Sequence, residues 1–159
     1  MLFRQAGGGD AEAVEALYRE VKAGENCCWE NGYPDETFVR FDLDEGGLFV
    51  LEEKGMLIGA VSLIAHDDLD ELPVWRYGRS CVLARLCVRP DRQGKGLGRL
   101  MTERVCAEGT RRGYESVRLL ADVRNEMANR LYRRLGFEER GTAVLYGHRY
   151  RTWERRAAL

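Results

Sequence analysis

A glycine-rich segment is the part of the sequence whose residue types most directly indicate a chemistry. Residues 93–98 read Gln-Gly-Lys-Gly-Leu-Gly, between an apolar run at 82–88 and an amphipathic stretch at 96–112. Glycine has no Cβ atom, so its backbone N–H groups can approach an anion closely and take unusual dihedral angles. The free amides and the dipole at a helix start favour a phosphate there. The spacing therefore predicts a strand, a phosphate-binding turn and a helix.

The common nucleotide-binding patterns do not fit this turn, although Arg92, Lys95 and Arg99 surround it with positive charge. The P-loop pattern G-x-x-x-x-G-K-[ST] is absent. The dinucleotide pattern G-x-G-x-x-G fails because Arg99 stands where the third glycine belongs. What remains is Gln-x-x-Gly-x-Gly after a strand, which predicts an anion site. A turn that merely opens a helix is the alternative interpretation.

A second motif lies at residues 125–137, which read Asn-Glu-Met-Ala-Asn-Arg-Leu-Tyr-Arg-Arg-Leu-Gly-Phe. This segment resembles the GNAT superfamily of N-acetyltransferases, whose pattern is Asn-x-x-Ala-x-x-Leu-Tyr-x-x-x-Gly-Phe, and every stated position agrees. Residues 92–98 are similar to the acyl-CoA loop of the same family. One glycine loop alone is a weak signal, but two signatures in the correct order are a strong one.

The resemblance implies an α/β fold, the GNAT fold, and acetyl-CoA as co-substrate. We expect one domain over residues 1–159, with a mixed central sheet of about six to seven strands, helices on both faces, and a splayed strand pair that forms the acyl-CoA cleft. A backbone segment on one strand of that pair would contact the pantetheine arm, the glycine loop would hold the pyrophosphate, and an asparagine would lie near the acyl group. The residues implied are Leu86, Cys87, Val88, Gln93, Gly94, Lys95, Gly96, Leu97, Gly98, Arg99 and Asn125.

The resemblance also assigns a catalytic role to Tyr132, as the general acid that protonates the departing CoA thiolate. A phenol with an ordinary pKa of about 10 is protonated at neutral pH and can donate. Tyr132 also belongs to a helical apolar stripe with Ala128, Leu131 and Leu135, so core packing is the alternative role.

The general base is left open by the sequence. Many relatives carry a glutamate on the strand before the glycine loop, but residues 82–88 contain no carboxylate. Proton loss through water, or an amine that is already partly neutral, would need no dedicated side chain. The candidate bases are Glu25, Glu30, His66, Asp67 and Glu71.

The expected acceptor is a primary amine of a small molecule or peptide. Residues 29–35, with Trp75, resemble a bacterial subgroup in which such segments wall the acceptor site, although Trp29 and Tyr33 would equally serve to cover a helix end. Superfamily members acylate antibiotics, polyamines, amino acids and protein termini, so neither the acceptor nor the acyl-chain preference follows from the motifs. Dimers are common among relatives, which makes a homodimer an open expectation.

Hydrophobic periodicity predicts the elements that position these residues. The order of expected elements is β-α-α-β-β-β-α-β-α-β-β, one mixed sheet with helices on its faces. Residues 66–80 are expected to form a long loop, and such loops tend to be functional. The expected strands are 2–6, 48–51, 57–64, 82–88, 115–122, 143–146 and 149–153, and the expected helices are 10–24, 35–42, 96–112 and 127–135.

Charge is unevenly distributed along the chain. Residues 1–80 carry 7 Lys and Arg against 17 Asp and Glu, and residues 81–159 carry 18 against 9, within a net charge of −1. A basic half suits a polyanionic cofactor and an acidic half suits a cationic amine. The alternative is that the two halves only offset each other.

Composition excludes several other classes. At 159 residues with 45% hydrophobic and 32% charged residues, the chain is globular. No apolar run approaches the roughly 18 residues of a membrane span, and no signal peptide is evident, so we expect a cytoplasmic protein that does not bind membranes. Its five cysteines follow no metal-binding pattern, so we expect reduced thiols and no metal.

Two other functions deserve comparison. A CoA-binding sensor without catalysis would keep the glycine loop; Tyr132 argues against it and the missing strand glutamate mildly for it. A nucleic-acid-binding domain would use the arginines of residues 81–159, but these lack an aromatic stacking pattern or a known motif. We therefore expect no nucleic-acid partner.

Overall fold

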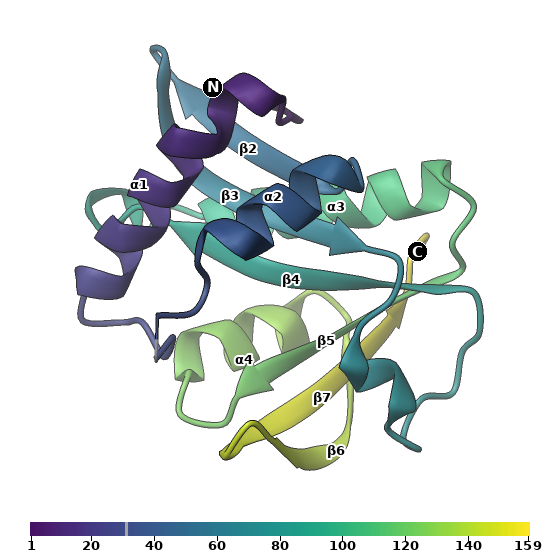
Figure 1. Ribbon diagram of the computed structural model, residues 1–159. Coiled ribbons are helices and arrows are strands. Elements are labelled where there is room, and N and C mark those ends of the chain that lie inside the picture. Colours follow the sequence, from purple (N-terminus) through teal and green to yellow (C-terminus); the bar gives the residue numbers. More distant parts are fainter. Residues whose placement is uncertain (31) are drawn as a thin grey trace.

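The computed structural model describes residues 1–30 and 32–159; Asn31, within the segment 29–35, lies outside the described residues. The chain forms one mixed sheet of seven strands in the order β1-β2-β3-β4-β5-β7-β6 (Figure 1). The strands are β1 (Leu2–Gln5), β2 (Leu48–Glu53), β3 (Met56–Ile64), β4 (Ser80–Val88), β5 (Ser116–Asp122), β6 (Glu138–Leu145) and β7 (His148–Arg156). The longer helices are α1 (Ala11–Ala23), α2 (Glu36–Asp44), α3 (Leu97–Arg111) and α4 (Glu126–Arg134).

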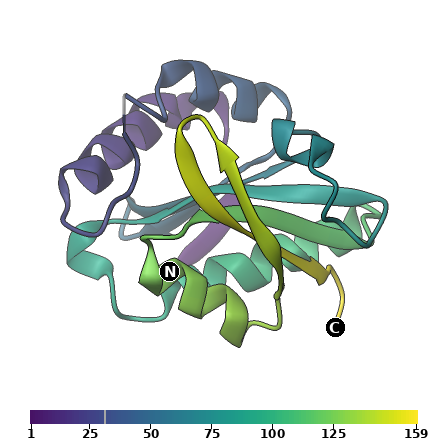
Figure 2. The ribbon, with the colours of Figure 1, turned by 90° about the horizontal axis from the view of Figure 1, so that it is seen from below.

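Helices cover both faces of the sheet, and Figure 2 shows α1 and α2 on one side with α3 and α4 on the other. The first pair buries residues such as Val14 and Val39 against the sheet, and the second buries residues such as Met101 and Val105. Because side chains alternate along a strand, Cys87 of β4 faces the α1 side while its neighbours face the α3 side. The predicted α/β fold and element order are confirmed.

The closing hairpin is longer than the sequence pattern predicts. β6 begins at Glu138 and pairs antiparallel with β7 as far as Leu145, with a register shift between Glu139 and Gly141. It is the last strand of the sheet and its first residues are mostly polar. An edge strand needs no apolar alternation, so this part of the hairpin leaves little periodic signal.

The β4–β5 pair separates along its length. The two strands run parallel and pair from Ser80 opposite Ser116 to Val82 opposite Arg118, and within the described register no further β4–β5 pair follows. β4 nevertheless continues to Val88. Arg85, in the separated part, has a positive φ of 52°, and the register with β3 shifts there. This bulge bends β4, and the expected splayed strand pair is therefore present.

The long loop before β4 is pinned to the sheet and contains a short 3-10 helix at Asp68–Glu71 (η2). The fully buried Glu154 carboxylate accepts the backbone N–H groups of Arg76 and Tyr77 at 2.9 and 3.0 Å. Trp75 donates its indole N–H to the Leu69 carbonyl at 2.8 Å. The loop thereby covers the part of the sheet that α1 and α2 leave open. Trp75 packs there against the buried cluster of Ile64, Leu69 and Val82.

A buried ion pair fastens α2 to the bulge of β4. Two nitrogens of Arg85 donate to the two carboxylate oxygens of Asp42 at 2.8 and 2.7 Å, and the two side chains are 4% and 0% exposed. The hydroxyl of Ser62 on β3 donates to the same carboxylate at 2.5 Å. The pair is bidentate and fully desolvated, so each partner depends on the other for its charge compensation.

Asp42→Ala should destabilise the fold by about 3–5 kcal/mol, because it leaves the Arg85 guanidinium buried without its counter-ion. Urea denaturation measures the change. Glu103→Ala is the control: it removes an exposed ion pair with Arg99 and should change stability by less than about 1 kcal/mol. Equal effects of the two substitutions would contradict the structural role given to the buried pair.

Candidate active site

The glycine loop forms a concave row of backbone amides at the start of α3. Gly94 and Gly96 have positive φ values of 77° and 80°, and Gly96 is the N-cap of the helix. Within the described residues no side chain caps this helix start, so the first-turn amides have no intrahelical acceptor. A Cβ built on either glycine would meet nothing within 4 Å, so the surface above the loop is open. The positive φ, rather than crowding, explains the glycines.

The side chain of Gln93 fixes the loop to its surroundings. Its Nε2 donates to the Val88 carbonyl at 3.0 Å, and its Oε1 accepts from Asn26 at 3.2 Å. The loop is therefore held at the end of β4. Lys95 and Arg99 are exposed beside the amides, and Arg99 pairs with Glu103 at 3.2 Å.

The separated half of β4 lies next to this loop. Leu86 and Val88 are partly buried against the α3–α4 core, as are Ala128 and Leu131 of α4. The Cys87 side chain is buried on the opposite face, and burial raises the pKa of its thiol. Since no described β5 residue pairs with this stretch, its backbone groups on the β5 side remain available to another extended chain.

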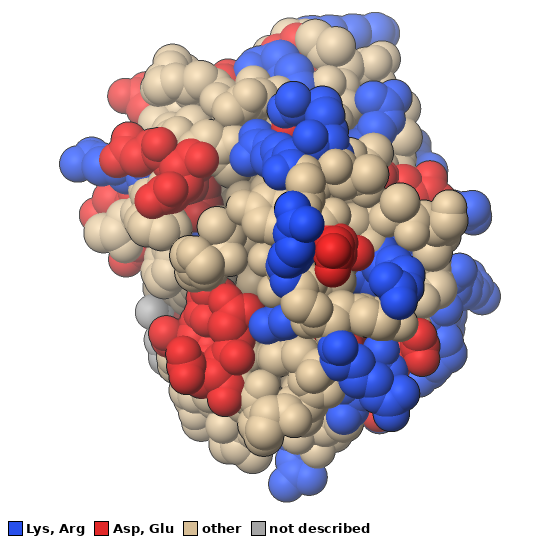
Figure 3. All heavy atoms as spheres, turned by 90° about the vertical axis from the view of Figure 1, so that its right-hand side faces the viewer, with Lys and Arg blue, Asp and Glu red and all other residues tan. Residues whose placement is uncertain are grey.

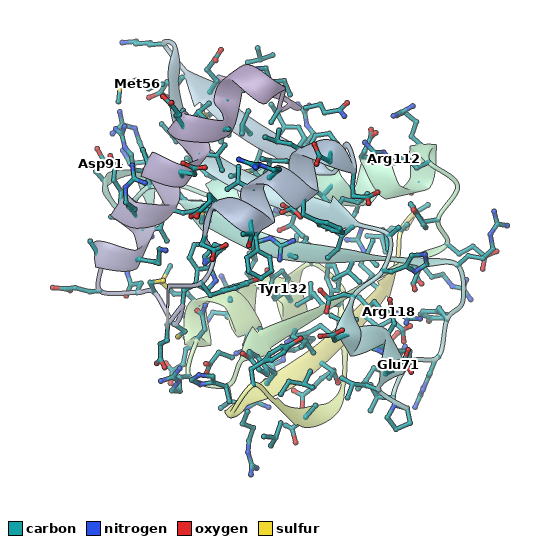
Figure 4. All side chains as sticks on the ribbon, in the orientation of Figure 1. Met56, Glu71, Asp91, Arg112, Arg118 and Tyr132 are labelled. Atoms are coloured by element: carbon teal, nitrogen blue, oxygen red, sulfur yellow. The ribbon has the colours of Figure 1, made fainter. Side chains whose placement is uncertain are left out.

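Tyr132 projects from α4 toward the sheet (Figure 4). Its side chain is 4% exposed and its ring packs edge-on against Phe137 at 5.5 Å. Burial raises the pKa of its phenol above the ordinary value. Among the described residues the Tyr132 hydroxyl has no hydrogen-bond partner. It is also not one of the polar side-chain atoms that are completely buried without a partner. The phenol thus stays protonated and retains its capacity to donate.

Asn125 and its neighbour Asn129 organise the start of α4. The Asn125 side chain accepts the N–H of Ala128 at 3.1 Å as the N-cap. Asn129, which the sequence did not single out, is buried: its Nδ2 donates to the Asp122 carbonyl at 2.9 Å and its Oδ1 accepts from Trp153 at 2.8 Å. It ties α4 to the ends of β5 and β7.

The five candidate bases occupy different environments. Glu25, His66 and Glu71 are exposed, and Figure 4 shows Glu71 on the outer loop, away from Tyr132. Glu30 is also exposed and is bridged by Arg124 at 3.2 Å and His148 at 3.4 Å. Asp67 differs because it is partly buried, and burial raises the pKa of its carboxyl.

Aromatic side chains of the segment before α2 pack edge-on against one another and against neighbouring helices. The Trp29 ring packs edge-on against the rings of Tyr18 and Tyr33, with centroid distances of 5.5 and 6.3 Å. The Tyr33 ring packs edge-on against that of Phe38 at a centroid distance of 4.8 Å. The Tyr33 hydroxyl accepts a hydrogen bond from Arg85 at 3.1 Å. Tyr33 therefore lies over the bulge of β4, whereas Trp75 packs in the loop that covers the sheet.

Charged side chains form separate patches of each sign on the face shown in Figure 3. The acidic patches lie toward the left of that view, the side on which α1 and α2 stand.

The described residues contain no group of three His, Cys, Asp or Glu placed to hold a metal ion. Within the same residues no helix is both long and apolar enough to cross a bilayer. All five cysteines are free, and Cys81, Cys87 and Cys106 are buried.

Comparisons with known proteins agree with the two motifs. A model of the acetyltransferase (GNAT) family matches residues 14–137. A mycothiol acetyltransferase of Cellulomonas flavigena is 34% identical over 107 residues, which are 65% of this chain and 30% of that protein. An N-acetyltransferase of Methanocaldococcus jannaschii is 31% identical over 97 residues, 61% of this chain and 41% of that protein. The chain thus spans about a third of the length of the curated relatives it matches.

Solved structures share the fold over nearly the whole chain. The yncA structure from Salmonella typhimurium, with its cofactor acetyl-CoA, has a TM-score of 0.78 at 22% identity and covers 100% of this chain and 95% of its own. A phosphinothricin acetyltransferase from Sinorhizobium meliloti, in complex with AcCoA, has a TM-score of 0.76 at 22% identity, covering 98% and 87%. At this identity the likeness establishes the fold.

Proposed function

The chain belongs to the acetyltransferase (GNAT) family, and from this premise we propose that it transfers an acetyl group from acetyl-CoA to a primary amine of a small molecule or peptide. The observation that carries the proposal is the glycine loop placed beside the separated half of β4. An amide-lined helix start and an unpaired strand edge suit the two ends of one ligand, an anionic diphosphate and an extended amide chain.

The residues present fit acetyl-CoA. We assign the pyrophosphate to the amides of residues 94–99, with Lys95 and Arg99 adding positive charge, and the pantetheine arm to the backbone of residues 86–88. Asn125, at the start of α4, would lie near the acyl group of acetyl-CoA. When bound, acetyl-CoA supplies an acyl thioester that an amine can attack directly.

Tyr132 is our candidate for the general acid. The departing thiolate needs a proton, and the Tyr132 hydroxyl has one that no described residue accepts. Burial raises the pKa of Tyr132, so the phenol holds this proton until a stronger base is generated beside it.

The formation of a homodimer stays a prediction.

Release of thiol from acetyl-CoA, followed across a panel of amines and peptides, tests the proposal as a whole. We expect turnover with at least one primary amine and none with the matching tertiary amine. Acetyl-CoA should also raise the melting temperature near its dissociation constant. A protein that shows neither thiol release nor a thermal shift would refute the assignment.

Gly96→Glu should abolish acetyl-CoA binding, because it places a negative charge and a side chain at the amides of the helix start. Isothermal calorimetry measures the affinity. Gly55→Glu is the matched control: Gly55 has a φ of 79° and open space around it, but lies in the turn between β2 and β3. Unchanged affinity in Gly96→Glu would place the cofactor elsewhere.

Tyr132→Phe should lower kcat on the order of 100-fold or more while acetyl-CoA affinity stays similar, because it removes one proton donor and keeps the ring packing. Steady-state kinetics and calorimetry provide the two readouts. Tyr114→Phe, at a partly buried tyrosine packed on the same core, is the control and should keep full turnover. If both variants retain wild-type kcat, Tyr132 only packs.

A further inference from the structure

Helix α4 carries Tyr132 and lies beside β5 and β7 (Figure 1). Within Glu126–Arg134, all of which the structure describes, two side chains are buried, Asn129 and Tyr132. They are three residues apart, so they lie on the same face of the helix, about 60° apart around its axis. One of the two buried side chains of this helix is thus an amide, which is costly to bury unless its polar atoms are hydrogen-bonded.

The Asn129 amide uses both of its donor hydrogens and its acceptor oxygen in one orientation. Its Nδ2 donates to the carbonyls of Asp122 and Asn125, both at 2.9 Å, and its Oδ1 accepts the indole N–H of Trp153 at 2.8 Å. An indole N–H only donates and a carbonyl only accepts, so a rotated amide would face two carbonyls with its oxygen. The three bonds therefore hold the side chain in a single conformation.

The partners of Asn129 belong to the paired strands on one side of the gap. Asp122 is the last residue of β5, and Trp153 is 1% exposed within β7, which pairs with β5 along its whole length. The bonds thus tie the first turns of α4 to both strands at once. The far end of the helix is tied to β7 as well, because Arg155 donates to the Leu135 carbonyl at 2.9 Å.

Tyr132 lies between these two attachments. Its ring packs against Phe137, and its hydroxyl has no hydrogen-bond partner among the described residues. No hydrogen bond within that part of the chain therefore directs the phenol, whose place at the gap follows from the position and rotation of α4. A displacement of about 1 Å can cost a reaction on the order of 100-fold in rate. The bonds of Asn129 are thus placed to control the reactivity of Tyr132.

We propose that Asn129 is a positioning residue for acetyl transfer: it fixes α4 against β5 and β7 so that the Tyr132 hydroxyl is directed at the β4–β5 gap. The inference rests on the proposed function, in which Tyr132 is the general acid. Asn129 is 6% exposed and its donors and acceptor are occupied, so it acts through the helix rather than on the reacting atoms. A purely structural amide would instead stabilise the fold without a specific effect on the acid.

A double-mutant cycle of Asn129→Leu and Tyr132→Phe tests the coupling between the two residues. Leucine has the same branching as asparagine and makes none of the three hydrogen bonds. In the protein with Tyr132, Asn129→Leu should lower kcat about tenfold or more and change the KM for acetyl-CoA by less than about threefold. In the Tyr132→Phe background it should change kcat by less than about twofold, because no proton donor is left to position. An equal loss of kcat in both backgrounds would overturn the proposal.

Trp153→Phe is a second variant, because it removes the indole N–H that Asn129 accepts and keeps an aromatic ring in the core. It should lower kcat about threefold or more in the protein with Tyr132 and by less than about twofold in the Tyr132→Phe background. The same loss of kcat with and without the Tyr132 hydroxyl would again assign the contact to the fold alone.

Thr152→Val is the matched control on the same strand. The buried Thr152 donates to the Gly141 carbonyl at 3.1 Å, a bond between β7 and β6 that does not involve α4. Its loss should lower the melting temperature but leave kcat within about twofold of wild type. A fall in kcat as large as that of Trp153→Phe would contradict a specific role of the Asn129 contacts.

Fluorine NMR of protein labelled with 3-fluorotyrosine follows Tyr132 without catalysis. The Tyr132→Phe variant identifies its resonance among those of the seven tyrosines. We expect Asn129→Leu to shift or broaden the Tyr132 resonance and to leave that of Tyr18, which is buried on the opposite face of the sheet, unchanged. An unchanged Tyr132 resonance in Asn129→Leu would overturn the proposal.

The kinetic and spectroscopic readouts separate the positioning role from the proposed function. A changed Tyr132 resonance in Asn129→Leu, in a protein that releases no thiol from acetyl-CoA with any amine, would support the link between the two residues and refute acetyl transfer. Thiol release that Tyr132→Phe leaves unchanged would retain acetyl transfer and refute both the acid and its positioning. Thiol release that depends on Tyr132 but not on Asn129 would retain the proposed function and refute the positioning role.

Discussion

The structure depends on the loss of pairing between β4 and β5 after Val82. Two adjacent strands that separate leave backbone N–H and C=O groups without partners, which is costly when they are buried. The chain limits this cost by pairing the far edge of each strand, β4 with β3 on both sides of the bulge and β5 with β7 along its whole length. Asn129 also satisfies the carbonyl at the end of β5, through a 2.9 Å hydrogen bond to Asp122. The gap is thus a supported feature of the sheet.

The bulge at Arg85 links this gap to the rest of the fold. Its positive φ marks the bend in β4, and its side chain, once turned toward α2, is stabilised by Asp42 and in turn holds Tyr33. One residue therefore shapes the strand, anchors α2 and holds the Tyr33 hydroxyl over the bulge. The charged residue at the bulge is thus a cation whose charge Asp42 already compensates.

Much of the fold and the donor side of the site could be predicted because their signals are local in sequence. The glycines of residues 93–98 and the motif at 125–137 each specify a turn or a helix within a few residues. The partnership of Arg85 with Asp42, and the buried Glu154 that holds the loop before β4, join residues far apart in the chain. Charged residues are expected at the surface, so no sequence pattern indicated these buried contacts. The start of β6 was missed because an edge strand carries little apolar alternation.

The central claim is that the helix start of α3 and the unpaired edge of β4 bind one ligand, acetyl-CoA. Backbone amide chemical shifts from a titration of ¹⁵N-labelled protein with acetyl-CoA test it most directly, because they report on both elements separately. The account predicts saturable changes at Gly94, Gly96 and Gly98 together with Leu86 and Val88, at one common dissociation constant. Changes confined to other elements, or two groups of residues with different dissociation constants, would contradict it.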